Sequence, residues 1–115
     1  MKNIAFVKMV ASGNDFVVMD NRKAVIPGAK LHSFAREICD RNYGVGGDGL
    51  IAIEPSKKAD FKMRIINSDG SEAEMCGNGA RCAALFAVGN KIAAKKMDFE
   101  TLAGIIQAEV NGAIV

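Results

Sequence analysis

The chain has 115 residues, of which 50% are hydrophobic and 24% are charged, and its formal net charge is +2. This composition is typical of one soluble globular domain with a modest core. So small and scattered a charge gives no basis for binding nucleic acid or a membrane surface. No apolar run approaches the ~18 residues that a membrane span needs.

The first half of the chain predicts two strands and one helix. The segment 4–10 contains Lys8 and lacks a small-residue cleavage site, so we expect a first strand there and not a signal peptide. A turn at 12–15 and a strand at 16–20 would complete a hairpin-like pair. Apolar residues recur at helical spacing over 31–42, which predicts an amphipathic helix.

The second half predicts short strands around a second helix. Apolar residues in 61–67 alternate with Lys62 and Arg64, which is the period of a half-buried strand. The other predicted elements are strands at 50–54, 97–101, 104–110 and 113–115, a turn at 68–71, and a helix at 79–89.

The predicted helix at 79–89 determines the expected fold. Between Ala80 and Val88 only Arg81 is charged, and a helix that is apolar on nearly every side is buried on nearly every side. Strands precede it and follow it. The sequence therefore predicts an α+β fold in which a curved, mainly antiparallel, barrel-like sheet wraps around a buried central helix.

Cys76 lies just before this helix, in the stretch EMCGNGARC at 74–82. A helix N-terminus offers unpaired N–H groups and the positive end of the helix dipole, so it can hold a carboxylate or a phosphate. Gly77 and Gly79 lack side chains that would keep a ligand from the backbone. The same field favours a thiolate, which could act as a nucleophile or a base. The alternative is a buried structural cysteine.

Cys39, Cys82 and His32 are assigned to structural roles. Both cysteines fall within predicted helices, where cysteine behaves as a small core residue. The spacing of Cys76 and Cys82 matches no common zinc pattern, and there is one histidine, so neither a metal site nor a cysteine–histidine hydrolase is expected. Three cysteines without close pairs indicate a reducing cytoplasm.

The glycine cluster at 43–49 contains a formal GxGxxG, formed by Gly44, Gly46 and Gly49. A dinucleotide-binding motif needs a strand before it and a helix after it, whereas here the predicted order is reversed. We therefore expect no such cofactor. The cluster is predicted to be a tight helix-to-strand turn, in which Asp48 could cap the backbone and which could line a site.

Asn14 and Asn67 lie at the ends of predicted strands. Asparagine is common in turns because its backbone tolerates unusual conformations, and this explanation stays open for both residues. Their amides could instead point into the same mouth of the barrel as Cys76.

Three stretches together resemble the N-terminal half of the diaminopimelate epimerase family. They are SGNDFVVMDN at 12–21, NYGVGGDGLI at 42–51 and MRIINSDGSEAEMCGNGARC at 63–82. The last is long and is centred on the family's active-site cysteine. The resemblance implies a cofactor-independent, two-base epimerisation that interconverts LL- and meso-diaminopimelate in lysine and peptidoglycan-precursor synthesis.

The resemblance also implies a role for particular residues. Cys76 matches one of the family's two catalytic thiols. Four residues match its substrate-binding positions: Asn14, Asn67, Gly77 and Asn78. The last two would present backbone N–H groups to the α-carboxylate. Some members carry a substrate-contacting glutamine at the position of Gly49, and that contact is not carried over.

Members of the family carry two such domains, with the second thiol and further substrate contacts in the second one. Residues 1–115 are therefore expected to form one N-terminal domain that needs a C-terminal partner domain, or else a second copy that supplies its own Cys76. Two other functions stay open. One is a proline-racemase-like enzyme, which the stretch at 66–82 disfavours, and the other is a non-catalytic anion-binding domain.

Overall fold

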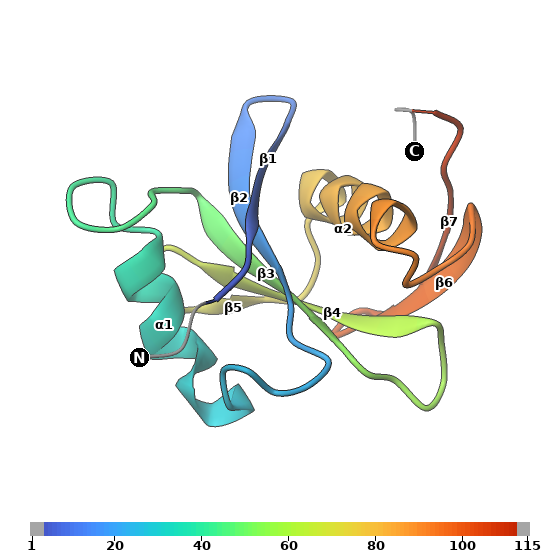
Figure 1. Ribbon diagram of the computed structural model, residues 1–115, viewed down its shortest axis with the longest axis horizontal. Coiled ribbons are helices and arrows are strands. Elements are labelled where there is room, and N and C mark those ends of the chain that lie inside the picture. Colours follow the sequence, from blue (N-terminus) through green and yellow to red (C-terminus); the bar gives the residue numbers. More distant parts are fainter. Residues whose placement is uncertain (1–3, 113–115) are drawn as a thin grey trace.

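The computed structural model describes residues 4–112, which form one mixed sheet of seven strands and two α-helices (Figure 1). The strands are β1 (Val7–Ala11), β2 (Asn14–Asp20), β3 (Gly49–Glu54), β4 (Phe61–Asn67), β5 (Glu72–Ala73), β6 (Lys96–Thr101) and β7 (Gly104–Glu109). The helices are α1 (Leu31–Ile38), which follows a 3-10 turn at Gly28–Lys30, and α2 (Gly77–Gly89). Neither helix is long and apolar enough to cross a membrane, within the part of the chain that is described.

The strands are arranged in the order β1-β2-β3-β4-β6-β7, and β5 pairs with β4. The pairs β2/β3 and β4/β6 are parallel, and the other four are antiparallel. Parallel neighbours need a crossover connection, and each parallel pair here is joined through one of the helices. The predicted α+β fold with a mainly antiparallel sheet is confirmed.

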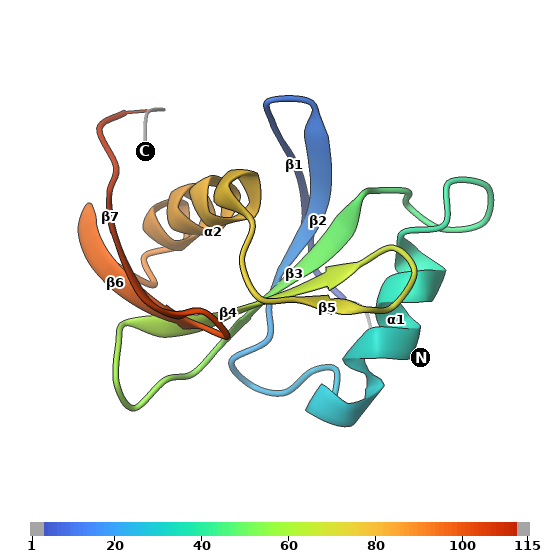
Figure 2. The ribbon, with the colours of Figure 1, turned by 180° about the vertical axis from the view of Figure 1, so that it is seen from behind.

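The two helices cover opposite faces of the sheet. α2 lies in the concave face, between the β1–β2 hairpin and the strands β6 and β7, while α1 packs on the other face (Figures 1 and 2). Successive side chains of a strand point to opposite faces. Val18 and Ile51 accordingly belong to the core around α2, and Val17 and Leu50 belong to the core around α1. The predicted buried central helix is confirmed.

The first hairpin differs from its predicted bounds. β1 begins at Val7 and not at residue 4, and β2 begins at Asn14 and not at Phe16. Ser12 and Gly13 have φ angles of 49° and 87°, which suits a two-residue hairpin loop. This short loop pairs Ala11 directly with Asn14, so Asn14 lies in the strand and not in a four-residue turn.

The first helix ends earlier than its predicted bound of residue 42. α1 ends at Ile38, because the Asp40 carboxylate accepts hydrogen bonds from the N–H groups of Asn42 and Tyr43 at 2.8 and 3.0 Å. A continuing helix would use these N–H groups itself. A local side-chain acceptor therefore competes successfully with the helix.

The glycine cluster folds back over the end of α1. The Gly46 N–H donates to the Ile38 carbonyl at 2.9 Å, and the Gly47 N–H donates to the Cys39 carbonyl at 3.2 Å. These bonds satisfy carbonyls that the helix leaves unpaired. A Cβ on Gly44 would overlap backbone carbonyl oxygens of α1, so the close passage requires glycine. The predicted helix-to-strand turn is confirmed.

The second half of the chain follows the prediction more closely. β4 has its predicted bounds, and β3, β6 and β7 differ from theirs by one residue. α2 begins at Gly77, two residues before its predicted start. The short strand β5, which pairs with β4, was not predicted. The strand predicted at 113–115 lies outside the described residues.

The attachment of β6 to β4 depends on a stacked aromatic pair. Phe61 and Phe99 are fully buried, and their ring centroids lie 4.9 Å apart with an interplanar angle of 12°. Only two residue pairs, Phe61 with Phe99 and Lys62 with Glu100, form the β4/β6 ladder. The side chains therefore contribute more to this junction than its few backbone hydrogen bonds.

We expect Phe99→Ala to lower the free energy of unfolding by about 3–5 kcal/mol, because it removes a buried ring and leaves a cavity. Urea unfolding followed by circular dichroism would measure this change. Ile105→Ala is the control, since Ile105 is 50% exposed and its replacement should change stability by roughly 0.5 kcal/mol or less. Similar losses in both variants would contradict the role given to the stack.

Candidate active site

Cys76 is the N-cap residue of α2. Its backbone is extended, with φ −144° and ψ 120°, and its carbonyl accepts the N–H of Ala80 at 2.8 Å. Its side chain is half-buried and makes no capping hydrogen bond. Within residues 4–112, the N–H groups of the first turn, at 77–79, have no hydrogen-bond partner. The thiol therefore lies beside free donors at the positive end of a helix dipole.

The two glycines after Cys76 serve different purposes. A Cβ on Gly79 would lie 2.9 Å from Cδ1 of Ile65, so a glycine here lets α2 begin against the sheet. A Cβ on Gly77 would meet nothing within 4 Å. The absence of a side chain at Gly77 therefore leaves open space beside the free N–H groups, through which a ligand could approach them.

Asn14 and Asn78 meet at the start of α2. The Asn78 Nδ2 group donates to the Oδ1 atom of Asn14 at 2.6 Å, and both side chains are half-buried. This bond joins the first residue of β2 to the first turn of α2. The structure thus brings Asn14, Gly77 and Asn78 together beside Cys76.

Asn67 lies at the same edge of the sheet but belongs to a separate set of hydrogen bonds. It is the last residue of β4, it is exposed, and it pairs in register with Gly49 at the start of β3. Its Nδ2 group donates to the Ser71 hydroxyl at 3.1 Å. The side chain is therefore engaged in its own turn and makes no hydrogen bond with Asn14 or Asn78.

Asp48 connects the ends of three strands. Its carboxylate accepts the Asn14 Nδ2 group at 3.2 Å and the Asp15 N–H at 3.1 Å, which confirms that Asp48 caps backbone. Its own carbonyl accepts the Ser68 N–H at 3.1 Å. The contact with Asn14 was not predicted from the sequence, since the two residues are 34 positions apart.

Asp15 is held by two cations. The Arg41 guanidinium binds both of its carboxylate oxygens, at 3.0 and 2.9 Å, and the Lys8 ammonium lies 3.0 Å away. The hydrogen bonds from Arg41, which have the larger effect, and from Lys8 hold the pKa of this carboxyl far below its ordinary value of 3.8. Arg41 also bonds Asp48 at 3.1 Å, so one guanidinium organises both carboxylates.

The other two cysteines and the histidine take no part in the hydrogen bonds of this site. Cys39 and Cys82 are buried, and burial raises the pKa of both thiols, for Cys39 to about 11. Their predicted role as core residues is confirmed. His32 lies on α1, on the opposite face of the sheet from α2, and its Nδ1 atom is 2.8 Å from the Gly70 carbonyl oxygen. No cluster in residues 4–112 has the ligands to hold a metal ion.

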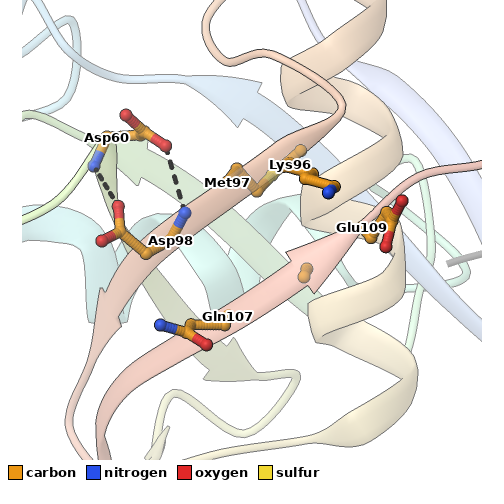
Figure 3. Close-up of a pocket in the computed structure, with 7 residues that line it drawn as sticks. Asp60, Lys96, Met97, Asp98, Gln107 and Glu109 are labelled. Atoms are coloured by element: carbon orange, nitrogen blue, oxygen red, sulfur yellow. Dashed lines mark hydrogen bonds between the residues drawn. The ribbon is translucent and has the colours of Figure 1, made fainter.

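A separate hollow lies on the β6–β7 ribbon, on the face turned away from α2 (Figure 3). Its lining residues are Asp60, Lys96, Met97, Asp98, Gln107, Ala108 and Glu109. The Asp60 carboxylate accepts the Asp98 N–H at 3.1 Å, and the Asp98 carboxylate accepts the Asp60 N–H at 3.2 Å. These carboxylates join the residue before β4 to β6, and the hollow contains none of the predicted site residues, so it is not the candidate site.

The ion pairs of Asp15 predict a specific acid sensitivity. The carboxylate is ionised in both folded and unfolded chains above its ordinary pKa of 3.8, where its stabilising contribution is complete. As the pH falls below that value, the unfolded chain takes up a proton that the folded chain does not, so stability is lost.

We therefore expect Asp15→Asn to be less stable than the unaltered protein at neutral pH, and to lose stability less steeply between about pH 4 and about pH 2. Urea unfolding at a series of pH values would measure both effects. Arg41→Gln should flatten the same slope in part, because Lys8 still bonds Asp15, and the double variant should flatten it no further than Asp15→Asn alone. If the stability of Asp15→Asn fell with pH in parallel with that of the unaltered chain, the prediction would be refuted.

Comparison with known proteins first identifies the fold. A crystal structure of a probable proline racemase from Agrobacterium radiobacter K84 superposes with a TM-score of 0.75, at 17% sequence identity, over 97% of this chain and 39% of that one. The half-barrel around a central helix is therefore shared with proteins of distant sequence.

The particular family follows from sequence. The family model for diaminopimelate epimerase matches residues 6–113, and the chain belongs to this family. The diaminopimelate epimerase of Carboxydothermus hydrogenoformans is 57% identical over 91% of the chain, and that of Archaeoglobus fulgidus is 50% identical over 94%. The chain spans 39% of the length of each of these two relatives.

Proposed function

We propose that this chain is the N-terminal half of a diaminopimelate epimerase and supplies one catalytic thiol, Cys76, with half of the substrate site. The observation that carries this proposal is the position of the Cys76 side chain at the N-terminus of α2. It makes no capping hydrogen bond, and it lies beside free N–H groups and the open space at Gly77. Residues 1–115 form one domain in this proposal, and a C-terminal domain adds the second thiol.

The geometry suits removal of a proton from an amino-acid α-carbon. Such a proton is a weak acid, so its removal requires stabilisation of the negative charge that develops on the carbon and its carboxylate. The N–H groups of Gly77 and Asn78 bind that carboxylate, and the α2 dipole adds to the effect. Asn14 and Asn67 bind other polar groups of the substrate.

The proposed proton transfers balance without a cofactor. The thiolate of one cysteine takes the α-proton, while the thiol of the other delivers a proton to the opposite face, which inverts the centre. Cys76 changes between thiolate and thiol, and the second cysteine changes in the opposite sense. LL-diaminopimelate becomes the meso isomer with no change in oxidation state, in a step of lysine and peptidoglycan-precursor synthesis.

The proposal includes the partner and the compartment. The partner is the second domain, and a pair of identical chains is the other arrangement that would bring two thiols together. The three cysteines are free, which supports a reducing cytoplasm. A proline-racemase-like activity finds support in the fold alone, at 17% identity, whereas the diaminopimelate activity is supported by relatives at up to 57%.

The first test is incorporation of deuterium at the α-carbon of LL- and meso-diaminopimelate in D₂O. The chain is assayed alone and with the C-terminal portion of the Carboxydothermus relative. We expect exchange with the two portions together, and its loss in Cys76→Ala. Cys39→Ala is the matched control, because it removes a buried thiol on the opposite face of the sheet.

Two results would count against the epimerase. Exchange that persists in Cys76→Ala would remove this thiol from the reaction. A folded two-part complex without exchange would favour the anion-binding domain. Exchange by the chain alone would instead support a site built from two copies.

A methyl group at Gly77 tests the binding of the substrate carboxylate. We expect Gly77→Ala to fold with a change in stability of about 1 kcal/mol or less, because the space is open and alanine favours a helix. The methyl group would nevertheless shield the free N–H groups and slow α-deuterium exchange roughly tenfold or more. Thermal unfolding and exchange measured on one sample would separate the two effects, and an unchanged exchange rate would contradict this role.

A further inference from the structure

Two asparagines connect an anionic residue to a cationic one through three hydrogen bonds. The Asp48 carboxylate accepts from the Nδ2 group of Asn14 at 3.2 Å. The Oδ1 atom of Asn14 accepts from the Nδ2 group of Asn78 at 2.6 Å. The Oδ1 atom of Asn78 accepts from the Arg81 guanidinium at 3.2 Å. We call this series the amide chain.

The charged ends determine the direction of the amide chain. An ionised carboxylate only accepts hydrogen bonds and a guanidinium only donates them, whereas an amide does both. If the Asn14 amide were reversed, its oxygen would face the Asp48 carboxylate and its NH₂ group would face the NH₂ group of Asn78. Only one arrangement pairs a donor with an acceptor at all three contacts. Each bond polarises the next, so the contacts reinforce one another.

Asp48 is itself fixed in place. Its Oδ1 atom accepts from Arg41 at 3.1 Å, and its Oδ2 atom accepts from the Asp15 N–H at 3.1 Å. Its backbone carbonyl accepts from Ser68, the residue after Asn67. The exposed Asp48 carboxylate is therefore bonded through both of its oxygens, and it anchors the Asn14 end of the amide chain.

We propose that Asp48 is a positioning residue of the active site. Through Asn14 it orients the Asn78 amide, and with it the first turn of α2 that carries Cys76 and the free N–H groups. This inference rests on the proposed function. Each amide uses one of its two N–H bonds in the chain, and within the described residues the other has no partner. The site therefore presents donors, which suits a carboxylate.

The test replaces a carboxylate with an amide of the same shape. In Asp48→Asn, one orientation of the new amide sets an NH₂ group against Arg41, and the other sets it against the Asp15 N–H. The first orientation keeps an acceptor for Asn14 but opposes two donors at Arg41, and the second also opposes the Asn14 Nδ2 group, so in both the amide chain loses its ionised acceptor. Asp60→Asn is the matched control, since the Asp60 carboxylate also accepts one backbone N–H, at 3.1 Å, but lies outside the amide chain.

The first measurement is a ¹⁵N–¹H spectrum of the side-chain amides. In Asp48→Asn, we expect the NH₂ signals of Asn14 and Asn78 to move and to exchange faster with water, while Asp60→Asn leaves both unchanged. Unchanged signals in Asp48→Asn would overturn the proposal. If Asp48→Asn does not fold, Arg81→Gln at the exposed end of the amide chain replaces it. That variant must move the Asn78 signal more than the Asn14 signal, and no movement overturns the proposal.

The second measurement is α-deuterium exchange by the two-part complex. Misplaced catalytic groups slow reactions by up to about a hundredfold, so we expect kcat for Asp48→Asn to fall roughly ten- to a hundredfold, with Asp60→Asn unaffected. Altered amide signals with an unaltered kcat would overturn the positioning role. An absence of exchange in the unaltered complex would refute the proposed function, while the amide signals would still decide whether Asp48 orients the two amides.

Discussion

The packing of α2 against the sheet determines the positions of the candidate site residues at the start of this helix. Its apolar side chains bury themselves in the concave face, which is the main favourable contribution to folding here. The contact at Gly79 allows the first turn to approach Ile65. A larger residue at that position would move Cys76 and the free N–H groups away from Asn14. The hydrophobic core thus determines the geometry of a polar site.

The strand directions gather the polar residues at one edge of the sheet. β2 and β3 are parallel and β4 is antiparallel to β3, so the starts of β2 and β3 meet the end of β4. Asn14, Asp48 and Asn67 lie at or next to these three ends. Because strand ends have unpaired backbone groups, side chains such as Asp48 can bond backbone there without breaking a ladder.

Local patterns predicted the elements, and long-range pairing decided the details of the site. One charge within a nine-residue run was enough to predict the burial of α2, and the glycines that follow Cys76 indicated a thiol at a helix start. The length of α1 was wrong because the periodicity of 31–42 says nothing about the Asp40 acceptor. The pairs Asp48–Asn14 and Arg41–Asp15 span 34 and 26 positions, and they depend on the register of parallel strands, which no local pattern contains.

Pairing of the acidic residues keeps this edge of the sheet suitable for an anion. Asp15 and Asp48 lie close to the residues that would bind a substrate carboxylate, and unpaired they would repel it. Lys8 and Arg41 bond Asp15, and Arg41 also bonds Asp48, so each negative charge has a cation beside it. Their oxygens accept hydrogen bonds from the backbone and from Asn14. The two carboxylates therefore orient donors at the start of α2 without cancelling the positive potential of the helix.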